Sequence, residues 1–217
     1  MNSIADKLRG RFLVIDGPDG AGKSTQIKLL AEHLRAGGVE LVLARDPGGT
    51  AIGDKIRAIL LDRAHDEMSV ACELMLYMAS RAQLVYQVIR PALAAGKCVL
   101  CDRYVSSTIA YQGAGGADIA AIRSAAQLAV DGAWPDLTLI VDVPSDVGLS
   151  RVGRTGGPDR MEAKAAAFHA RVRELFLQQA ADEPSGFAVV DGSGDVGGVQ
   201  DRLRRAIKDW QPKRDNA

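Results

Sequence analysis

The stretch GPDGAGKST at 17–25 limits most strongly what this chain can fold into. It directly follows the apolar run RFLVID and fits the pattern G-x-x-x-x-G-K-[ST]. In that pattern the glycines let successive backbone N–H groups wrap a phosphate, and a helix beginning near the lysine adds its positive dipole end. The stretch therefore predicts a strand, a phosphate-binding loop and a helix, in that order.

The polar side chains of this loop have separate tasks. Lys23 brings a point charge to the β- and γ-phosphates, and Ser24 offers a hydroxyl to Mg²⁺. The alternative is an ordinary glycine-rich turn, which the combination of strand, loop and helix disfavours. The residues expected to bind ATP are Gly17, Pro18, Asp19, Gly20, Ala21, Gly22, Lys23, Ser24 and Thr25.

Five short apolar runs recur along the chain with helix-length segments between them. They are FLVID (12–16), ELVLAR (40–45), CVLCD (98–102), LTLIVDV (137–143) and FAVVD (187–191). Runs of this kind predict an α/β fold with a five-stranded parallel sheet flanked by helices, and a ligand site at the carboxyl ends of the strands. A length of 217 residues fits one domain over 1–217, with a frayed tail at about 211–217.

The charge balance gives no sign of a polyanionic partner. The 27 basic and 27 acidic residues cancel, which removes a global attraction to nucleic acid or to an anionic membrane. The first ten residues, MNSIADKLRG, lack the apolar core of a signal peptide, and no run approaches the roughly 20 apolar residues of a membrane span. We therefore expect a cytoplasmic protein.

Three cysteines give no disulfide framework. Cys98 and Cys101 form a C-x-x-C, but they lie within a predicted buried strand, where residues three apart point to opposite faces. Core packing is therefore favoured over metal or redox chemistry for this pair.

A bound nucleotide leaves three classes of protein: a GTPase switch, a motor or transporter ATPase, and a small-molecule kinase. Asparagine occurs only at Asn2 and Asn216, so the Asn-Lys-x-Asp guanine motif is absent from the domain. No L-S-G-G-Q-like signature of transporter ATPases is present either, and 217 residues are too few for the extra elements of most motor ATPases. A kinase is what remains.

A kinase for a phosphorylated acceptor needs positive charge opposite the loop to offset the repulsion between phosphates. Arg57, Arg81 and Arg103 are candidates, and Arg103 follows the end of a predicted strand, where side chains point into the cleft. Tyr77 and Arg81 are four residues apart on a predicted helix over 69–94, so they can stack on a base and donate to its carbonyl edge. The alternative, a surface stripe of Glu73, Tyr77 and Arg81, is equally compatible with this spacing.

Six segments together resemble bacterial thymidylate kinases, within the P-loop nucleoside monophosphate kinases, along nearly the whole chain. In order they are IDGPDGAGKST, RDPGGTAIGDKIR, ELMLYMASRAQL, DRYVSSTIAYQG, PDLTLIVDV and GPDRMEAKAAAFHARVRELF. The resemblance implies ATP-dependent phosphorylation of thymidine 5′-monophosphate (dTMP), with Mg²⁺ as cofactor, by a homodimer packed through long helices.

The resemblance also implies roles for matching residues on the acceptor side. Arg57 and Arg103 would hold the 5′-phosphate, Asp19 would meet the sugar 3′-hydroxyl, and Arg81 would donate to the thymine carbonyl. The base and sugar pocket would be lined by Tyr77, Ser107, Tyr111 and Gln112, with Tyr111 disfavouring a 2′-hydroxyl. Asp102 would organise Mg²⁺ through water, beside Ser24. Two positions depart from the usual family residues, since Asp46 replaces a glutamate and Tyr77 replaces a phenylalanine.

The segment RVGRTGGPDR at 151–160 corresponds to the family's lid. In some members the catalytic arginine stands in the phosphate loop, at the position that Gly20 occupies here. The resemblance therefore implies the type in which the lid supplies this charge, from Arg151, Arg154 or Arg160, with Arg154 preferred because Arg151 is expected to end a helix.

Two alternatives remain open. The first is another deoxynucleoside or nucleoside monophosphate kinase. A kinase for deoxynucleosides would need a carboxylate to take the proton of a sugar hydroxyl, and Asp16 or Asp102 would be the candidates. A nucleotide-binding module with an idle site is disfavoured by the intact Lys23, Ser24 and Arg103.

Overall fold

The computed structural model describes residues 3–151 and 159–212 of the chain. Its strands are β1 (Phe12–Asp16), β2 (Leu41–Arg45), β3 (Cys98–Asp102), β4 (Leu137–Asp142) and β5 (Phe187–Asp191). Its helices are α1 (Ile4–Leu8), α2 (Lys23–Ala36), α3 (Ala51–Leu61), the 3₁₀ turn η1 (Arg63–His65), α4 (Val70–Leu84), the π-helical turn η2 (Val85–Ile89), α5 (Arg90–Ala94), α6 (Val105–Ala114), α7 (Ile119–Val130), α8 (Ser145–Arg151), α9 (Ala166–Asp182) and α10 (Val196–Asp209).

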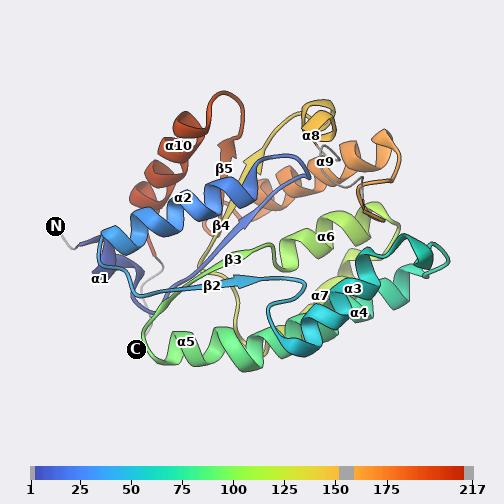
Figure 1. Ribbon diagram of the computed structural model, residues 1–217, viewed down its shortest axis with the longest axis horizontal. Coiled ribbons are helices and arrows are strands. Elements are labelled where there is room, and N and C mark those ends of the chain that lie inside the picture. Colours follow the sequence, from blue (N-terminus) through green and yellow to red (C-terminus); the bar gives the residue numbers. More distant parts are fainter. Residues whose placement is uncertain (1–2, 152–158, 213–217) are drawn as a thin grey trace.

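The five strands form one parallel sheet in the order β2-β3-β1-β4-β5, with helices on both faces (Figure 1). The predicted fold class is confirmed, and each predicted strand is found within one residue of its expected ends. β1 lies in the middle of the sheet between β3 and β4, so the loop that follows it opens at the centre of the carboxyl edge.

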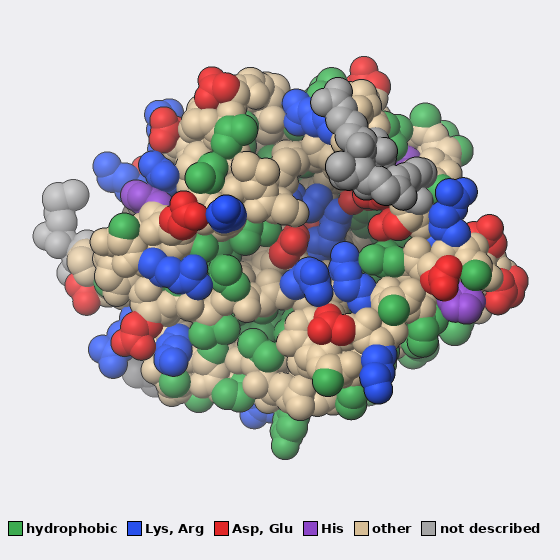
Figure 2. Space-filling view, in the orientation of Figure 1, with side chains coloured by type: hydrophobic (Ala, Val, Ile, Leu, Met, Phe, Trp, Pro, Cys, Tyr) green, Lys and Arg blue, Asp and Glu red, His purple; other side chains and the backbone are tan. Residues whose placement is uncertain are grey.

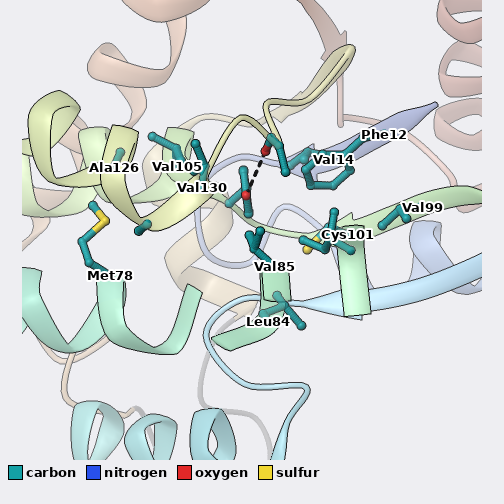
Figure 3. Close-up of a cluster of buried hydrophobic side chains, with 14 of the residues drawn as sticks. Phe12, Val14, Met78, Leu84, Val85, Val99, Cys101, Val105, Ala126 and Val130 are labelled. Carbon is teal, nitrogen blue, oxygen red and sulfur yellow. Dashed lines mark hydrogen bonds between the residues drawn. The ribbon is translucent and has the colours of Figure 1, made fainter. Parts of the chain in front are cut away.

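Side chains alternate between two cores along the central strands. Phe12 and Val14 point into the core under α4 and α7, whereas Leu13 and Ile15 point into the core under α2 and α10. Figure 3 shows the first of these cores, with Val14 and Cys101 from adjacent strands facing Met78 and Val130. A strand with apolar side chains on both faces is covered on both sides, which explains its unbroken apolar run.

Cys98 and Cys101 follow the same alternation. Cys101 belongs to the core under α4 and Cys98 to the core under α2, so the two thiols lie on opposite faces of the sheet. Both are buried and free, and burial raises the pKa of each thiol. The expectation of core cysteines is confirmed.

The long helix predicted over 69–94 is present as three joined pieces. Ser69 caps α4 by accepting a hydrogen bond from the N–H of Cys72 at 3.2 Å, and η2 and α5 continue the helix to Ala94. Pro91 lies at the start of α5, where its missing N–H interrupts the regular i to i−4 ladder. Among the described residues, no helix is both long and apolar enough to cross a membrane.

Candidate active site

The loop between β1 and α2 has the backbone that its glycines predict. Gly17, Gly20 and Gly22 have φ angles of 131°, 73° and 88°, in the region that L side chains rarely adopt. Gly22 occupies the position that precedes α2 in left-handed conformation, so the first N–H groups of α2 face the loop. The loop therefore has the curvature and the helix N-terminus that a phosphate site needs.

Lys23 folds its ammonium group back into this loop. Its Nζ donates to the carbonyl oxygens of Gly17 at 2.9 Å and Pro18 at 2.7 Å. Only 7% of the surface of this residue is exposed. Burial, and after it the nearby charge of Arg103, lowers the pKa of Lys23 from 10.5 to about 8. A phosphate that entered the loop would add an anionic partner for this ammonium to the nearby charges of Asp19, Asp102 and Asp16.

Asp16, at the end of β1, fastens the first turn of α6 to the loop. Its Oδ1 accepts from the N–H of Gly17 at 2.9 Å and from the hydroxyl of Ser107 at 2.7 Å, and its Oδ2 accepts from the hydroxyl of Ser106 at 2.6 Å. The carboxylate is fully buried. These contacts make Asp16 a structural anchor between β1 and α6.

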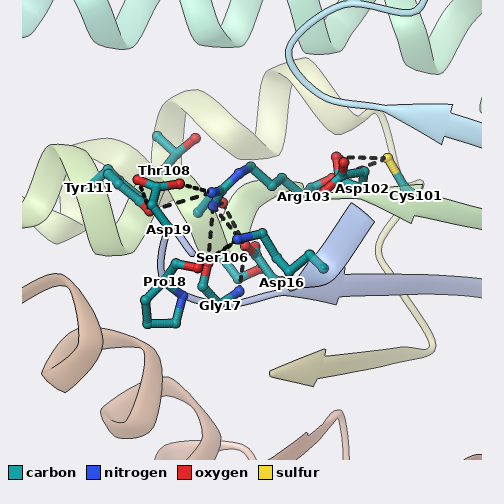
Figure 4. Close-up of polar contacts among 12 residues, drawn as sticks. Asp16, Gly17, Pro18, Asp19, Cys101, Asp102, Arg103, Ser106, Thr108 and Tyr111 are labelled. Carbon is teal, nitrogen blue, oxygen red and sulfur yellow. Dashed lines mark hydrogen bonds and ion pairs between the residues drawn. The ribbon is translucent and has the colours of Figure 1, made fainter. Parts of the chain in front are cut away.

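Arg103 crosses the cleft from the end of β3 (Figure 4). Its guanidinium donates to the carbonyl oxygen of Gly17 at 3.2 Å and to the hydroxyl of Ser107 at 3.0 Å, and it forms an ion pair with Asp19. It lies over the ring of Tyr111, 5.1 Å from the centroid, while the Tyr111 hydroxyl donates to Asp19 Oδ2 at 2.7 Å. The structure therefore brings together three side chains predicted to bind the acceptor: Asp19, Arg103 and Tyr111.

The charge of Arg103 governs the ionisation of Asp19. Burial alone would raise the Asp19 pKa, but Arg103 and then Lys23 outweigh it and hold that pKa below its ordinary value. Asp19 is thus an anionic residue of the phosphate loop that contacts Arg103 and Tyr111 on the acceptor side of the cleft.

Arg81 lies on the opposite wall and is buried, with 1% of its surface exposed. Its Nε donates to Asp46 Oδ2 at 2.6 Å and its Nη2 donates to Thr108 Oγ1 at 2.8 Å. Glu73 is also buried, and Tyr77 is half-buried and lines the cleft. The alternative of a surface stripe on this helix is therefore wrong, because α6 and the loop after β2 cover that face.

These walls enclose a cleft of about 540 Å³, visible in Figure 2 as a central hollow in which basic and acidic side chains gather. Thirteen of the predicted side chains line it: Asp19, Lys23, Ser24, Thr25, Arg57, Tyr77, Arg81, Asp102, Arg103, Ser107, Tyr111, Gln112 and Arg151. Thr108, Asp159 and Glu162 also line it and were not predicted. The acidic pair in DRME flanks a predicted site arginine, which was the signal available for Asp159 and Glu162.

Two residues of the cleft fit a magnesium site. Ser24 stands in the first turn of α2, and Asp102 ends β3 across the loop. Asp102 Oδ1 is buried and has no hydrogen-bond partner in the described part of the chain. Within the described residues no group of three or more His, Cys, Asp or Glu side chains could hold a metal. A site with two protein groups, Ser24 and Asp102, suits Mg²⁺, because this ion keeps several waters and binds one or two protein groups plus substrate phosphates.

The three predicted lid arginines have different positions. Arg151 ends α8, as expected, and its Nη1 donates to the carbonyl oxygen of Gly20 at 3.4 Å. Arg154 lies outside the described residues. Arg160 is 7% exposed and does not line the cleft, because its Nε donates to the Leu60 carbonyl oxygen at 2.9 Å and its guanidinium pairs with Glu73.

Comparison with known proteins agrees with this geometry. The family model for thymidylate kinase matches residues 15–203. The chain belongs to the thymidylate kinase family. It is 44% identical over 205 residues to the thymidylate kinase of Alcanivorax borkumensis, covering 94% of this chain and 99% of that protein. It is 46% identical over 197 residues to that of Pseudomonas fluorescens strain Pf-5, covering 90% and 94%.

A solved member of the thymidylate kinase family shares the fold. The thymidylate kinase of Ehrlichia chaffeensis superposes with a TM-score of 0.74 at 32% identity, over 91% of this chain and 98% of that one. Family membership makes the chain a phosphotransferase, in agreement with the kinase predicted by elimination from its sequence.

Proposed function

We propose that this chain transfers the γ-phosphoryl group of ATP to dTMP, giving the diphosphate for dTTP synthesis in the cytoplasm. The observation that carries the proposal is a phosphate loop facing Arg103, Arg57 and Tyr111 across one cleft, in a member of the thymidylate kinase family. The whole chain acts as one thymidylate-kinase-like domain.

The chemistry requires positioning and charge neutralisation rather than a covalent intermediate. The acceptor phosphate is already a nucleophile near neutral pH, so the chain needs only to align it with the γ-phosphate and offset the negative charge. Lys23 and the N-terminus of α2 hold the donor phosphates, and Arg57 and Arg103 hold the acceptor phosphate. Arg154 or Arg151 adds charge at the transferred group.

Mg²⁺ would be held by Ser24 and, through water, by Asp102, and when bound it neutralises charge on the β- and γ-phosphates. The unpaired Oδ1 of Asp102 supports this assignment.

A nucleoside kinase would instead need a free carboxylate base. Asp16 is ill suited to that task, because its carboxylate is fully buried and accepts three hydrogen bonds from the loop and α6.

We assign the thymine pocket to the far wall of the cleft, which α4 and α6 form opposite the phosphate loop. Arg81 would donate to the thymine carbonyl beside Gln112, and Tyr77 would stack on the ring. Tyr111 would close on the sugar and select against a 2′-hydroxyl, while Asp19 would accept from the 3′-hydroxyl. Support comes from the fact that all five side chains line one cleft, where Asp19 belongs to the phosphate loop and the other four face that loop.

A homodimer is part of the proposal. Met75 on α4, Tyr86 on η2 and Leu128 on α7 expose 59%, 74% and 86% of their surfaces, although α4 and α7 pack against each other. Large apolar side chains exposed on neighbouring long helices favour a second copy as their cover. Sedimentation equilibrium of the wild type and of Leu128→Glu tests this assembly, and a monomeric wild type at micromolar concentration contradicts it.

The acceptor is tested by ADP release from ATP in the presence of Mg²⁺. The assay compares dTMP, dUMP, other monophosphates and thymidine, with Lys23→Ala and Arg103→Ala as site variants. We expect dTMP to be the best acceptor and both variants to lose most of the activity. Turnover of thymidine without turnover of dTMP would favour a nucleoside kinase, and no turnover of any acceptor would favour an idle binding module.

A further inference from the structure

A buried polar cluster formed by Glu73, Gln112 and Arg160 lies behind the far wall of the cleft. The three residues expose 5%, 1% and 7% of their surfaces. Only Gln112 lines the cleft itself. Two charged groups have therefore been taken out of water beside the proposed nucleotide pocket without reaching into it.

Glu73 uses both of its carboxylate oxygens in this cluster. Oε1 accepts from Gln112 Nε2 at 2.7 Å, and Oε2 pairs with the guanidinium of Arg160. Arg160 in turn donates through Nε to the carbonyl oxygen of Leu60 at 2.9 Å, and its backbone N–H donates to the carbonyl oxygen of Leu61 at 3.3 Å. Leu60 and Leu61 end α3, so Arg160 satisfies carbonyl groups that the helix itself leaves without a partner.

The cluster touches each of the three helices that carry the proposed acceptor contacts. Leu60 lies one turn after Arg57 on α3, Glu73 lies one turn before Tyr77 on α4, and Gln112 follows Tyr111 on α6. The described contacts of Glu73 and Arg160 include no residue of the phosphate loop. The Glu73 carboxylate thus links α4 to α6 directly and to α3 through Arg160. These contacts lie on the acceptor side of the cleft.

Stability alone gives little reason for this arrangement. A buried ion pair recovers little more than the cost of its desolvation, and apolar side chains of the same volume are commonly as stabilising. What an ion pair with two further hydrogen bonds adds is a defined geometry. Because Gln112 Nε2 is turned toward Glu73, the carboxylate also fixes which end of this amide faces the rest of the pocket.

We propose that Glu73 and Arg160 are positioning residues for the acceptor nucleotide, acting through Gln112 and through the end of α3. This inference rests on the proposed function and gives Arg160 a task other than contact with the transferred phosphoryl group. Loss of either side chain should weaken binding of the monophosphate and leave ATP binding nearly unchanged.

The test uses Glu73→Gln, Arg160→Met and the double variant Glu73→Leu/Arg160→Met. Titration calorimetry measures Kd for the monophosphate without ATP and for ATP without the monophosphate, and thermal unfolding is followed in parallel. We expect each single variant to weaken monophosphate binding about tenfold or more, with ATP binding within about twofold. The double variant leaves no unpaired buried charge, so its unfolding temperature should return toward the wild-type value while monophosphate binding stays weak.

Asp142→Asn is the matched control. Asp142 forms a bidentate ion pair with Arg173, whose Nε and Nη2 donate to Oδ1 and Oδ2 at 2.7 and 2.8 Å. It lies outside the cleft lining. Its substitution should lower the unfolding temperature without changing monophosphate affinity. The inference is overturned if monophosphate affinity in the double variant recovers together with stability, or if ATP and monophosphate affinities fall in parallel.

All variants are measured with the monophosphate that the wild type phosphorylates best. A best acceptor other than dTMP would overturn the proposed function and leave this test intact. Unchanged binding of that acceptor by the single variants would overturn the inference and leave the proposed function intact.

Discussion

A side chain on Gly20 would collide with the backbone of Gly148. A Cβ built on Gly20 stands less than 3.0 Å from the carbonyl oxygen and Cα of Gly148, and a Cβ built on Gly148 would meet the carbonyl oxygen of Asp19 in the same way. The phosphate loop and α8 therefore touch backbone to backbone. This contact gives a physical reason why the loop carries no arginine at Gly20.

Gly20→Ala should abolish ATP binding and destabilise the fold by more than about 2 kcal/mol, since both the positive φ and the collision oppose a methyl group. Gly132→Ala is the control, because Gly132 has a φ of 79° and nothing within 4 Å of its built Cβ. Chemical denaturation and ATP titration should show a smaller stability loss and normal ATP binding for Gly132→Ala. Equal effects of the two substitutions would show that the contact with Gly148 is unimportant.

ATP binding should take up a proton at alkaline pH. Lys23 has a pKa of about 8 in the free protein, so near pH 9 its amine is mostly neutral, whereas phosphate groups in the loop favour the ammonium. Linkage then predicts that ATP affinity is level below pH 7 and falls by up to about tenfold per pH unit above 8. Calorimetry in buffers of different ionisation enthalpy measures the uptake, which should approach one proton at pH 9.

Lys23→Met is the control for this measurement. It should bind ATP more weakly and show no proton uptake between pH 8 and 10. Wild-type binding at pH 9 without proton uptake would contradict the lowered pKa.

Arg81→Ala should weaken dTMP binding more than ATP binding, because its contacts lie on the wall opposite the loop. It also leaves the buried carboxylate of Asp46 without its partner, which should cost roughly 3–5 kcal/mol of unfolding free energy. Combining it with Asp46→Asn should restore much of the stability and little of the dTMP affinity. Equal losses for the two nucleotides in a folded variant would remove the role in reading the base.

Arg154→Ala should lower kcat by about 10³-fold, by analogy with arginine fingers, and change the KM for dTMP much less. The reason is that a charge at the transferred phosphoryl group stabilises the transition state more than the bound acceptor. Steady-state kinetics of Arg151→Ala and Arg154→Ala decide between the two. An intact rate for Arg154→Ala would transfer the assignment to Arg151, whose guanidinium already contacts the loop carbonyl of Gly20.

Local sequence patterns predicted the strands and the phosphate loop well. β1 and β3 are buried on both faces, so their unbroken apolar runs identify them without knowledge of neighbours. The loop was equally predictable, because Gly17, Gly20 and Gly22 have positive φ angles, which glycine adopts far more readily than other residues.

The partners of the charged side chains could not be predicted in the same way. The spacing of Tyr77 and Arg81 fixed a shared helix face, but Asp46 and Thr108, which bury that face, come from distant parts of the chain. Arg160 was assigned to the lid by its place in the sequence. Only the approach of α3 and α4 reveals that Glu73 and the Leu60 carbonyl engage it.

The central place of β1 in the sheet has a consequence for how the protein is made. β1 is translated well before both of its hydrogen-bonding neighbours, β3 and β4. Until β3 has emerged, the run FLVID has no strand to pair with, and until β4 has emerged one of its edges stays unpaired and open to aggregation, the hazard that chaperones limit. The strand that leads into the phosphate loop thus gains its full set of strand contacts only once β4 has been translated.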